Sequence, residues 1–407
     1  MTRRVRIPFR SGAWPSLILG LLAAAAAHAE TSPLSIHREG FGLEVSGFTA
    51  RERAMGEAGL ASVTRQGLSI PNPSRTAFHD KTSFTATLDM DVDYLQDEVT
   101  SNRTSSFLLP SMGMNFNSRR LGNLGLFFRQ RFSRNYEFTP FNPPVGQPIQ
   151  SFLAEGGIYE LAATWAYAPI PSLALGVGYH YLLGRERIIY ATDFHNDPDN
   201  PLSNGTNLEG DTLTTRSSGG YPSLSMTFRQ KKFSLGLTGA LGMELDQDHF
   251  RTVTNSLSNQ EFSSSRDLPW STGLGFAFKP SASHTVVADF AMESWDSDTS
   301  GLLNPSFRVG SGYEFQGMGS LYDRYFKKMA YRGGLGYERL YLQETDQYYL
   351  TAGAGLPLGR RGNLMDIALK YGHRGTLKNN LWTEDFIKLS VSMTGVGIWG
   401  QSVRKRK

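Results

Sequence analysis

Residues 233–246 read FSLGLTGALGMELD, and this stretch decides the predicted fold. Its odd positions are apolar or glycine, whereas its even positions are small, polar or acidic. A period of two residues is that of a β-strand, because successive side chains point to opposite faces. At about 3.3 Å per residue the run would span roughly 40 Å, which suits a strand tilted across a bilayer better than a strand of a globular domain.

Similar alternation recurs along the chain, and we count about fourteen such strands, an even number as bacterial single-chain barrels have. Turns of few residues alternate with long polar loops, as periplasmic turns and extracellular loops do. Aromatic residues at strand ends form the pattern of an interfacial girdle. They are Trp165, Tyr167, Phe276, Phe278 and Trp399. The predicted fold is therefore an all-β, transmembrane antiparallel β-barrel.

The alternative is a soluble protein of several sheets, whose strands are usually shorter and whose inner faces must pack together. Many long strands with small, polar inward faces would leave such a core unfilled.

Two local details of the barrel are also predicted. In residues 124–132, Phe132 should face the lipid and Arg131 the lumen, and residues 135–155 should form an exposed loop.

Composition excludes several classes of site. The chain has 407 residues, 43 glycines, no cysteine and a net charge of +4. Without cysteine, thiolate metal sites, cysteine nucleophiles and disulfides are excluded. Part of the positive charge lies in the two terminal segments, so no nucleic-acid partner is predicted. No glycine-rich phosphate loop and no metal-ligand spacing occurs, and we predict neither a cofactor nor a metal.

The N-terminus has the pattern of a secretory signal peptide. A basic region from Arg3 to Arg10 precedes the apolar run Trp14 to Ala27, and Ala27-His28-Ala29 is a small-x-small cleavage pattern. The run is short for a membrane anchor, which is the alternative interpretation. We predict that residues 1–29 are removed on export and that the mature protein resides in the outer membrane of a Gram-negative bacterium.

Residues 30–81 lack a strand period and are rich in glycine and alanine. The sequence MGEAGLA at 55–61 is followed by Asn72-Pro73-Ser74. This pair of motifs resembles the FadL-type family of outer-membrane transporters, in which a glycine-alanine segment precedes Asn-Pro-Ala and folds as a hatch inside the barrel. Here Ser74 stands where alanine is usual, and Asn-Pro alone starts turns in any fold. The resemblance implies a plug motif at Gly56, Ala58, Gly59, Asn72 and Pro73.

The last hairpins extend this resemblance. Residues 331–337 (YRGGLGY), 353–358 (GAGLPL) and 371–376 (YGHRGT) are similar to the final hairpins of FadL-like proteins of the Bacteroidetes kind. The predicted organisation is a signal peptide (1–29), a hatch or plug (30–81), a barrel (82–400) and a basic tail (401–407). The tail follows Trp399, whereas many barrels end on the terminal aromatic residue that the assembly machinery reads.

Charged residues on the inward faces form the candidate site. Three aspartates stand in one column on the first strand, and the last two strands, which close the barrel beside it, present Lys388, Lys370 and Asp366. Unpaired charges in a confined lumen are costly, so we predict that they pair, partly through Arg51, Glu52, Arg53 and Glu57 of the plug. A structural role is favoured over ligand contact, with a cation site at the aspartates as the alternative. The predicted lumenal charge network comprises Asp89, Asp91, Asp93, Arg129, Arg131, Asp366, Lys370 and Lys388.

Catalysis is not predicted. Of the eight histidines only His180 is expected to lie deep in the lumen, and no residue next to it in sequence identifies a nucleophile. The resemblance implies instead a monomeric barrel, embedded in outer-membrane lipid and folded by the barrel-assembly machinery, that passes hydrophobic ligands such as long-chain fatty acids or aromatic hydrocarbons. The alternatives are a barrel that serves as a secretion or surface-anchoring partner, and a general porin.

Overall fold

A computed structural model describes most of the chain after residue 39. The described residues are 40–64, 67–98, 101–118, 121–138, 149–193, 208–253, 259–295, 303–319, 323–342, 345–359, 362–380 and 382–397. The predicted signal peptide, Trp399 and the basic tail lie outside these residues. In the described part of the chain, no helix has the length and hydropathy of a membrane-spanning helix.

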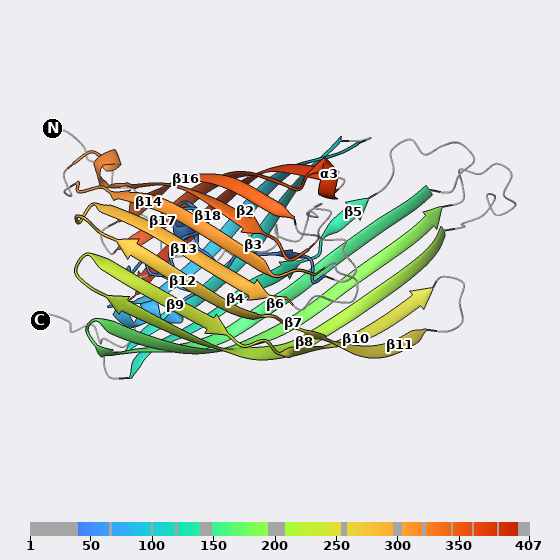
Figure 1. The fold of residues 1–407 in the computed structure, drawn as a ribbon, viewed down its shortest axis with the longest axis horizontal. Coiled ribbons are helices and arrows are strands. Elements are labelled where there is room, and N and C mark those ends of the chain that lie inside the picture. The colour runs from blue at the N-terminus through green and yellow to red at the C-terminus, as the bar shows by residue number, and fades with distance from the viewer. Residues whose placement is uncertain are drawn as a thin grey trace, which may run out of the picture.

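The wall is a closed antiparallel barrel of fourteen strands, which confirms the predicted fold class (Figure 1). Neighbours in sequence pair with one another, and β18 pairs with β2 to close the ring. Three strands are built from two segments each, namely β4–β5, β9–β10 and β11–β12. The segments are β2 (Thr82–Asp97), β3 (Ser101–Ser118), β4 (Gly122–Ser133), β5 (Tyr136–Phe138), β6 (Ile149–Ile170), β7 (Leu173–Asp193), β8 (Leu208–Arg229), β9 (Phe233–Ala240), β10 (Glu244–Val253), β11 (Gln260–Asp267), β12 (Trp270–Phe278), β13 (His284–Ser294), β14 (Ser306–Gln316), β15 (Ala330–Arg339), β16 (Asp346–Leu358), β17 (Asn363–Arg374) and β18 (Trp382–Gly397).

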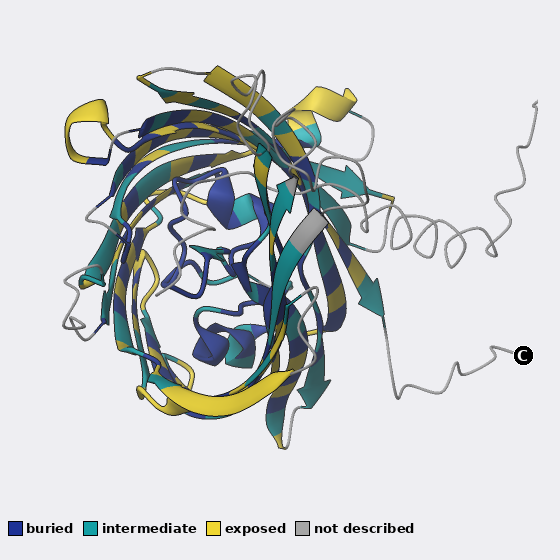
Figure 2. Cartoon of the chain, turned by 90° about the vertical axis from the view of Figure 1, so that its right-hand side faces the viewer, coloured by how far each residue is buried: buried dark blue, intermediate teal, exposed yellow. Residues whose placement is uncertain are grey.

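Side chains alternate between the outside and the lumen, as the stripes of Figure 2 show. On β7, for example, the large apolar residues Leu175, Val177 and Tyr179 are exposed on the outer face. The inward positions between them carry small or polar residues, and His180 is 5% exposed. This arrangement places apolar side chains where a barrel meets lipid.

The two ends of the barrel differ. Short turns, such as residues 171–172 and 230–232, lie at one end, which we call the turn end. Most of the longer connections lie at the other, the loop end, although the connection 317–329 between β14 and β15 is at the turn end. β6 and β8 have 22 residues each, a length of roughly 70 Å, so this side of the wall extends well beyond a hydrocarbon core of about 30 Å. The predicted loop at 135–155 was wrong in part, because β5 and the start of β6 lie within it.

The stretch 233–246 is not one unbroken strand. β9 pairs with β8 through Ala240 and Ser223, and β10 pairs with β8 through Asp246 and Ser218, so residues 241–245 face the shorter run 219–222. This one-residue bulge inverts the facing of everything after it, because the period of a strand is two. Leu245 is therefore buried in the lumen instead of facing lipid, and Glu244 and Asp246 are exposed.

A second bulge corrects the prediction for Phe132. The pairing of β4 with β6 shifts register between Gln130 and Phe132. Phe132 thereby turns into the lumen, where it is fully buried, and Arg131 is also lumenal. Sequence alternation alone does not reveal such a shift, because a bulge adds a residue to one strand without changing its composition.

Residues 40–64 and 67–81, which we call the inner segment, lie inside the ring of strands (Figure 2). The segment contains β1 (Leu43–Glu44), α2 (Ala50–Arg53) and η2 (Pro73–Phe78). It begins near the loop end, where the Phe41 amide donates to the Tyr341 hydroxyl at 3.0 Å, and it reaches the turn end where β2 begins. Outside the barrel proper are two further helical turns, η4 (Tyr325–Lys328) and α3 (Leu377–Asn380).

An apolar cluster packs in the lumen toward the loop end, and we call it the lumenal cluster. It joins Phe41 of the inner segment to side chains of the wall and of the connections between strands, and Trp295 stacks on Tyr341 with ring centroids 4.2 Å apart. Such a cluster is unlike the polar, water-filled interior of a porin. Its buried members are Phe41, Phe132, Ile158, Leu182, Tyr221, Leu245, Leu268, Trp295, Leu340, Tyr341, Leu342 and Trp382.

Candidate functional site

Within the described residues, ion pairs tie the inner segment to the wall at four places. Each joins a charged side chain between residues 44 and 57 to an oppositely charged side chain on a strand, so the segment is held on several sides of the lumen. The pairs are Glu44 with Arg131 (3.4 Å), Arg51 with Glu314 (3.0 Å), Arg53 with Asp89, and Glu57 with Lys370 (3.3 Å).

Further ion pairs link strands of the wall, both adjacent and more distant ones, and each member of the predicted charge network has a partner of opposite sign. Asp91 contacts Lys388 across the closing strands at 2.9 Å, and both are named in that network. Other partners were not singled out from the sequence, although their inward positions on alternating strands mark them as lumenal. These contacts are Asp93–Arg374 (3.7 Å), Arg129–Glu160 (2.7 Å), Arg131–Glu293 (2.6 Å) and Asp366–Arg332 (2.7 Å).

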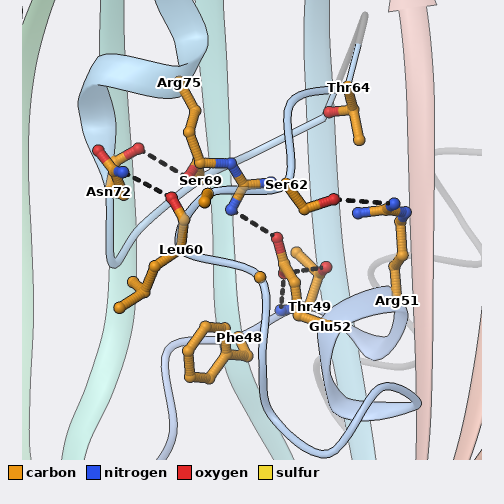
Figure 3. A network of polar contacts seen from close by, with 12 residues as sticks. Phe48, Thr49, Arg51, Glu52, Leu60, Ser62, Thr64, Ser69, Asn72 and Arg75 are labelled. Atoms are coloured by element: carbon orange, nitrogen blue, oxygen red, sulfur yellow. Dashed lines mark hydrogen bonds and ion pairs between the residues drawn. The ribbon is translucent and has the colours of Figure 1, made fainter. Parts of the chain in front are cut away.

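Asn72 anchors the end of the inner segment to the wall. Its side-chain amide donates to the Leu60 carbonyl at 2.6 Å and to the Thr227 hydroxyl at 3.1 Å (Figure 3). Ser74 donates to the Asn72 side chain at 2.6 Å and lies 2.7 Å from the Thr227 hydroxyl. A serine at this position, where the related motif has alanine, therefore adds polar contacts to the anchor. Pro73 begins η2, where its missing N–H is not needed.

The glycine-alanine part of the motif lies directly against the wall. Gly56 has a φ of +72°, and a Cβ there would lie 2.4 Å from the Leu335 carbonyl oxygen. The amides of Gly59 and Leu60 donate to one carboxylate oxygen of Asp289 at 2.6 and 2.7 Å. Ala58 is fully buried among small and apolar side chains. Small residues are thus needed because backbone meets backbone at this contact.

Internal contacts brace the inner segment itself. Glu52 caps α2 by accepting from the Thr49 amide at 2.9 Å, and it also accepts from Arg75 at 3.0 Å (Figure 3). Arg51 donates to the Ser62 hydroxyl at 3.2 Å. Glu52 is therefore paired within the segment, whereas Arg51 and Arg53 also reach the wall.

Two carboxylates of the inner segment have opposite pKa shifts. Burial, and then the charge of Glu293, raise the pKa of Glu44 to about 7. Burial would also raise the pKa of Glu57, but the positive charges of Lys370 and Arg308 outweigh it and lower that pKa to about 2. Glu57 is therefore a permanent anion of the lumen, whereas Glu44 titrates near neutral pH.

A cavity of ≈ 140 Å³ lies between the inner segment and the wall. One side of it is apolar and is formed by Phe48, Leu60 and Ile70 of the inner segment. The other side carries charged and polar side chains of the wall, namely Arg129, Arg131, His180, Ser223, Glu293 and Arg308. Among the described residues, no group of three histidine, aspartate or glutamate side chains is arranged to hold a metal ion.

A polar array on four successive strands borders this cavity. Arg129 on β4 contacts Glu160 on β6, Glu160 contacts the Nδ1 of His180 on β7 at 2.8 Å, and the Nε2 of His180 lies 2.8 Å from the Ser223 hydroxyl on β8. Sequence reasoning found His180 but not its partners. They lie on adjacent strands far along the chain, and only the register of pairing brings them together.

The wall is interrupted beside the lumenal cluster. A groove of ≈ 600 Å³ follows the break between β9 and β10 and the neighbouring break between β11 and β12. Its lining includes Leu241, Met243 and Trp270, which are exposed, and Leu268, which also belongs to the lumenal cluster. The groove on the outer surface therefore meets the lumenal cluster at Leu268.

Comparisons with known proteins agree with this architecture. A family model described as BamG matches residues 14–405. Among solved structures, a FadL homologue of Pseudomonas aeruginosa has a TM-score of 0.62 and 12% identity, covering 87% of this chain and 99% of that one. The toluene transporter TodX of Pseudomonas putida has a TM-score of 0.58 and 13% identity, covering 86% and 98%. No curated protein matches the sequence. At these identities the likeness shows a FadL-type barrel fold, and the Bacteroidetes kind of the last hairpins stays a prediction.

Proposed function

The chain belongs to the BamG family, and from this premise and the chemistry of its lumen we propose that it passes hydrophobic compounds across the outer membrane through a barrel closed by its inner segment. The lumenal cluster carries this proposal, because it makes the interior of the loop end apolar, which a porin does not need. The likeness of the fold to a toluene transporter supports the same class of ligand.

The inner segment acts as a plug in this proposal. Its ion pairs, together with Asn72 and the close contact at Gly56, hold it in the lumen. The remaining cavity of ≈ 140 Å³ has room for a small aromatic ring but not for a long-chain fatty acid. A long ligand therefore requires displacement of the plug or exit through the groove beside Leu268. The same filled lumen disfavours a general porin.

Two neighbouring substitutions test the route. Ser271 on β12 lines the cavity, whereas Ala288 on the neighbouring strand β13 is exposed and lies outside the cavity lining. Ser271→Leu should reduce uptake of labelled toluene or fatty acid by cells that depend on this protein, because the larger side chain fills the cavity. Ala288→Leu is the matched control and should leave uptake unchanged. Equal uptake by both variants, at equal amounts of folded barrel, would remove the cavity from the route.

A second proposal follows from the family itself. The name BamG belongs to the nomenclature of the barrel-assembly machinery, and the many ties between plug and wall suit a rigid component as well as a gated channel. In this case the protein is a partner of that machinery and not only its product. The proposed contact surface is the part of β6, β7 and β8 that extends beyond the membrane.

One comparison separates the two proposals. Cells lacking the protein should lose uptake of the labelled hydrophobic compound and keep normal levels of other outer-membrane barrels if it is a transporter. If it is an assembly partner, other barrels should fall and the central assembly barrel should co-purify with it. Normal uptake in the deletion strain contradicts the transport proposal.

A further inference from the structure

Glu160, His180 and Ser223 form a hydrogen-bonded row with the geometry of a nucleophile, a base and a carboxylate that orients the base. The carboxylate accepts from the imidazole Nδ1 at 2.8 Å, and the imidazole Nε2 lies 2.8 Å from the serine hydroxyl. Both distances are within the range expected of such a row. It faces the lumenal cavity, which is lined by His180 and Ser223.

The strand register builds this row. His180 pairs directly with Tyr221, and Ser223 pairs with Gly178, so the imidazole and the hydroxyl are diagonal neighbours on the lumenal face. Diagonal neighbours on adjacent strands are within reach of a long or aromatic side chain. Gly178 is required for the contact, since a Cβ there would lie 2.7 Å from the Ser223 oxygen and 3.1 Å from the Nε2 of His180.

The surroundings hold the imidazole and the carboxylate in place. The ring of His180 stacks on that of Tyr221 with centroids 4.6 Å apart and planes at 2°. The Tyr221 hydroxyl and Arg129 both donate to the second oxygen of Glu160, at 2.8 and 2.7 Å. Glu160 is fully buried, so its free oxygen is directed to His180 and fixes the orientation of the ring.

We propose that Ser223 is the nucleophile of an esterase site in the lumen, with His180 as its general base and Glu160 as the residue that positions His180. The Ser223 oxygen attacks the carbonyl carbon of a carboxylic ester while its proton passes to the Nε2 of His180. The ester C–O bond then breaks, and the alcohol leaves with that proton. A water molecule, deprotonated by His180, hydrolyses the acyl-serine, and the carboxylic acid is released as the proton returns to Ser223.

The cavity defines the substrate class. Its volume of ≈ 140 Å³ accommodates a short acyl chain, and Phe48, Leu60 and Ile70 provide apolar contacts for it. The guanidinium of Arg129 borders the same space. A positive charge beside the cavity favours the negative charge that develops on the carbonyl oxygen of an ester. Short-chain esters of apolar acids are therefore the expected substrates.

A fluorophosphonate probe tests the nucleophile in the purified full-length barrel. Ser223 should be modified, as located by mass spectrometry of the labelled peptide, and the Ser223→Ala variant should not react. Ser225 is the matched control, since it faces the lumen two residues further on the same strand but contacts Ser74 and not a histidine. Ser225→Ala should react like the parent. Retained resistance of the barrel to unfolding in detergent shows that each variant is folded.

Hydrolysis of p-nitrophenyl butyrate tests the base and the positioning residue. His180→Gln should lower turnover by about 10²–10⁴-fold. Glu160→Gln should lower turnover and shift the pH profile, and Tyr221→Phe should lower turnover by less, because it keeps the ring stack and removes one of the two donors to the second oxygen of Glu160. A folded parent that is neither labelled at Ser223 nor hydrolytic would overturn the proposal and leave the row as a structural lock. The esterase and transport proposals fail separately, because uptake by Ser223→Ala cells is measured independently.

Discussion

The guanidinium of Arg53 on the inner segment pairs with the carboxylate of Asp89 on β2, and these side chains are 2% and 0% exposed. Arg53 also donates to the Phe48 and Ser46 carbonyl oxygens and to the Ser390 hydroxyl, at 3.0, 2.9 and 2.9 Å. One side chain of the plug thus joins two parts of its own chain to the two strands, β2 and β18, that close the barrel.

Arg53→Met should loosen the inner segment strongly. Removal of one partner of a buried pair leaves the other charge unpaired, at a cost of about 3–5 kcal/mol. We expect much faster hydrogen exchange in residues 46–58. Arg187→Met is the matched control because it removes an arginine from an exposed pair with Glu155, whose side chains are 49% and 52% exposed, and should cost about 0–1 kcal/mol. Similar exchange in the two variants would contradict an anchoring role for Arg53.

Gly56→Ala tests the contact between the plug and the wall. Gly56 and Gly67 both have positive φ angles, of +72° and +113°. A Cβ at Gly56 would meet carbonyl oxygens of the wall at 2.4 and 2.5 Å, whereas one at Gly67 would meet nothing within 4 Å. Gly67→Ala should therefore cost only the backbone strain, about 1–2 kcal/mol. Gly56→Ala should cost more and should expose the plug to protease, and equal sensitivity of the two variants would show that backbone strain alone matters.

The attachment of β1 should weaken as the pH rises. The folded pKa of Glu44, about 7, lies above its ordinary value of 4.5. Between these two pH values the folded protein keeps a proton on Glu44 that the unfolded chain has lost. Stability from this group is present below pH 4.5 and is lost as the pH rises through 7. The protection factors of residues 41–48, which compare the observed exchange with the intrinsic rate at the same pH, should be smaller at pH 8 than at pH 5. Glu44→Gln should abolish the difference, and a difference that persists would assign it to another group.

His79 should give the opposite dependence. Burial, and then the charge of Arg75, lower the pKa of His79 to about 3 from 6.5. Between these values the unfolded chain binds more protons than the folded one, so stability falls as the pH drops through this window. The protection factors of amides near the turn end, in residues 76–82, should be smaller at pH 4.5 than at pH 7. His79→Gln cannot titrate and should reduce this change, and an undiminished change would exclude His79 as its source.

How far the sequence alone reaches can be followed along β9 and β10. The alternation from Phe233 to Ala240 indicates correctly a strand with an apolar outer face. From Glu244 the same alternation misleads, because one extra residue opposite β8 inverts the facing and brings Leu245 into the lumenal cluster. A bulge depends on how many residues the partner strand supplies, and no local pattern contains that number.

The amino-acid sequence by itself determined the period of two, the absence of cysteine, the inward charges and the glycine-alanine segment. Each of these is a property of the composition or of residues close to one another along the chain. Only the tertiary structure decided which charges meet, such as Arg53 with Asp89, and that Glu160, His180 and Ser223 form one row. Contacts between residues distant along the chain depend on the register of strands around a closed ring. That register is set by the packing of the whole barrel at once, including the segment inside it.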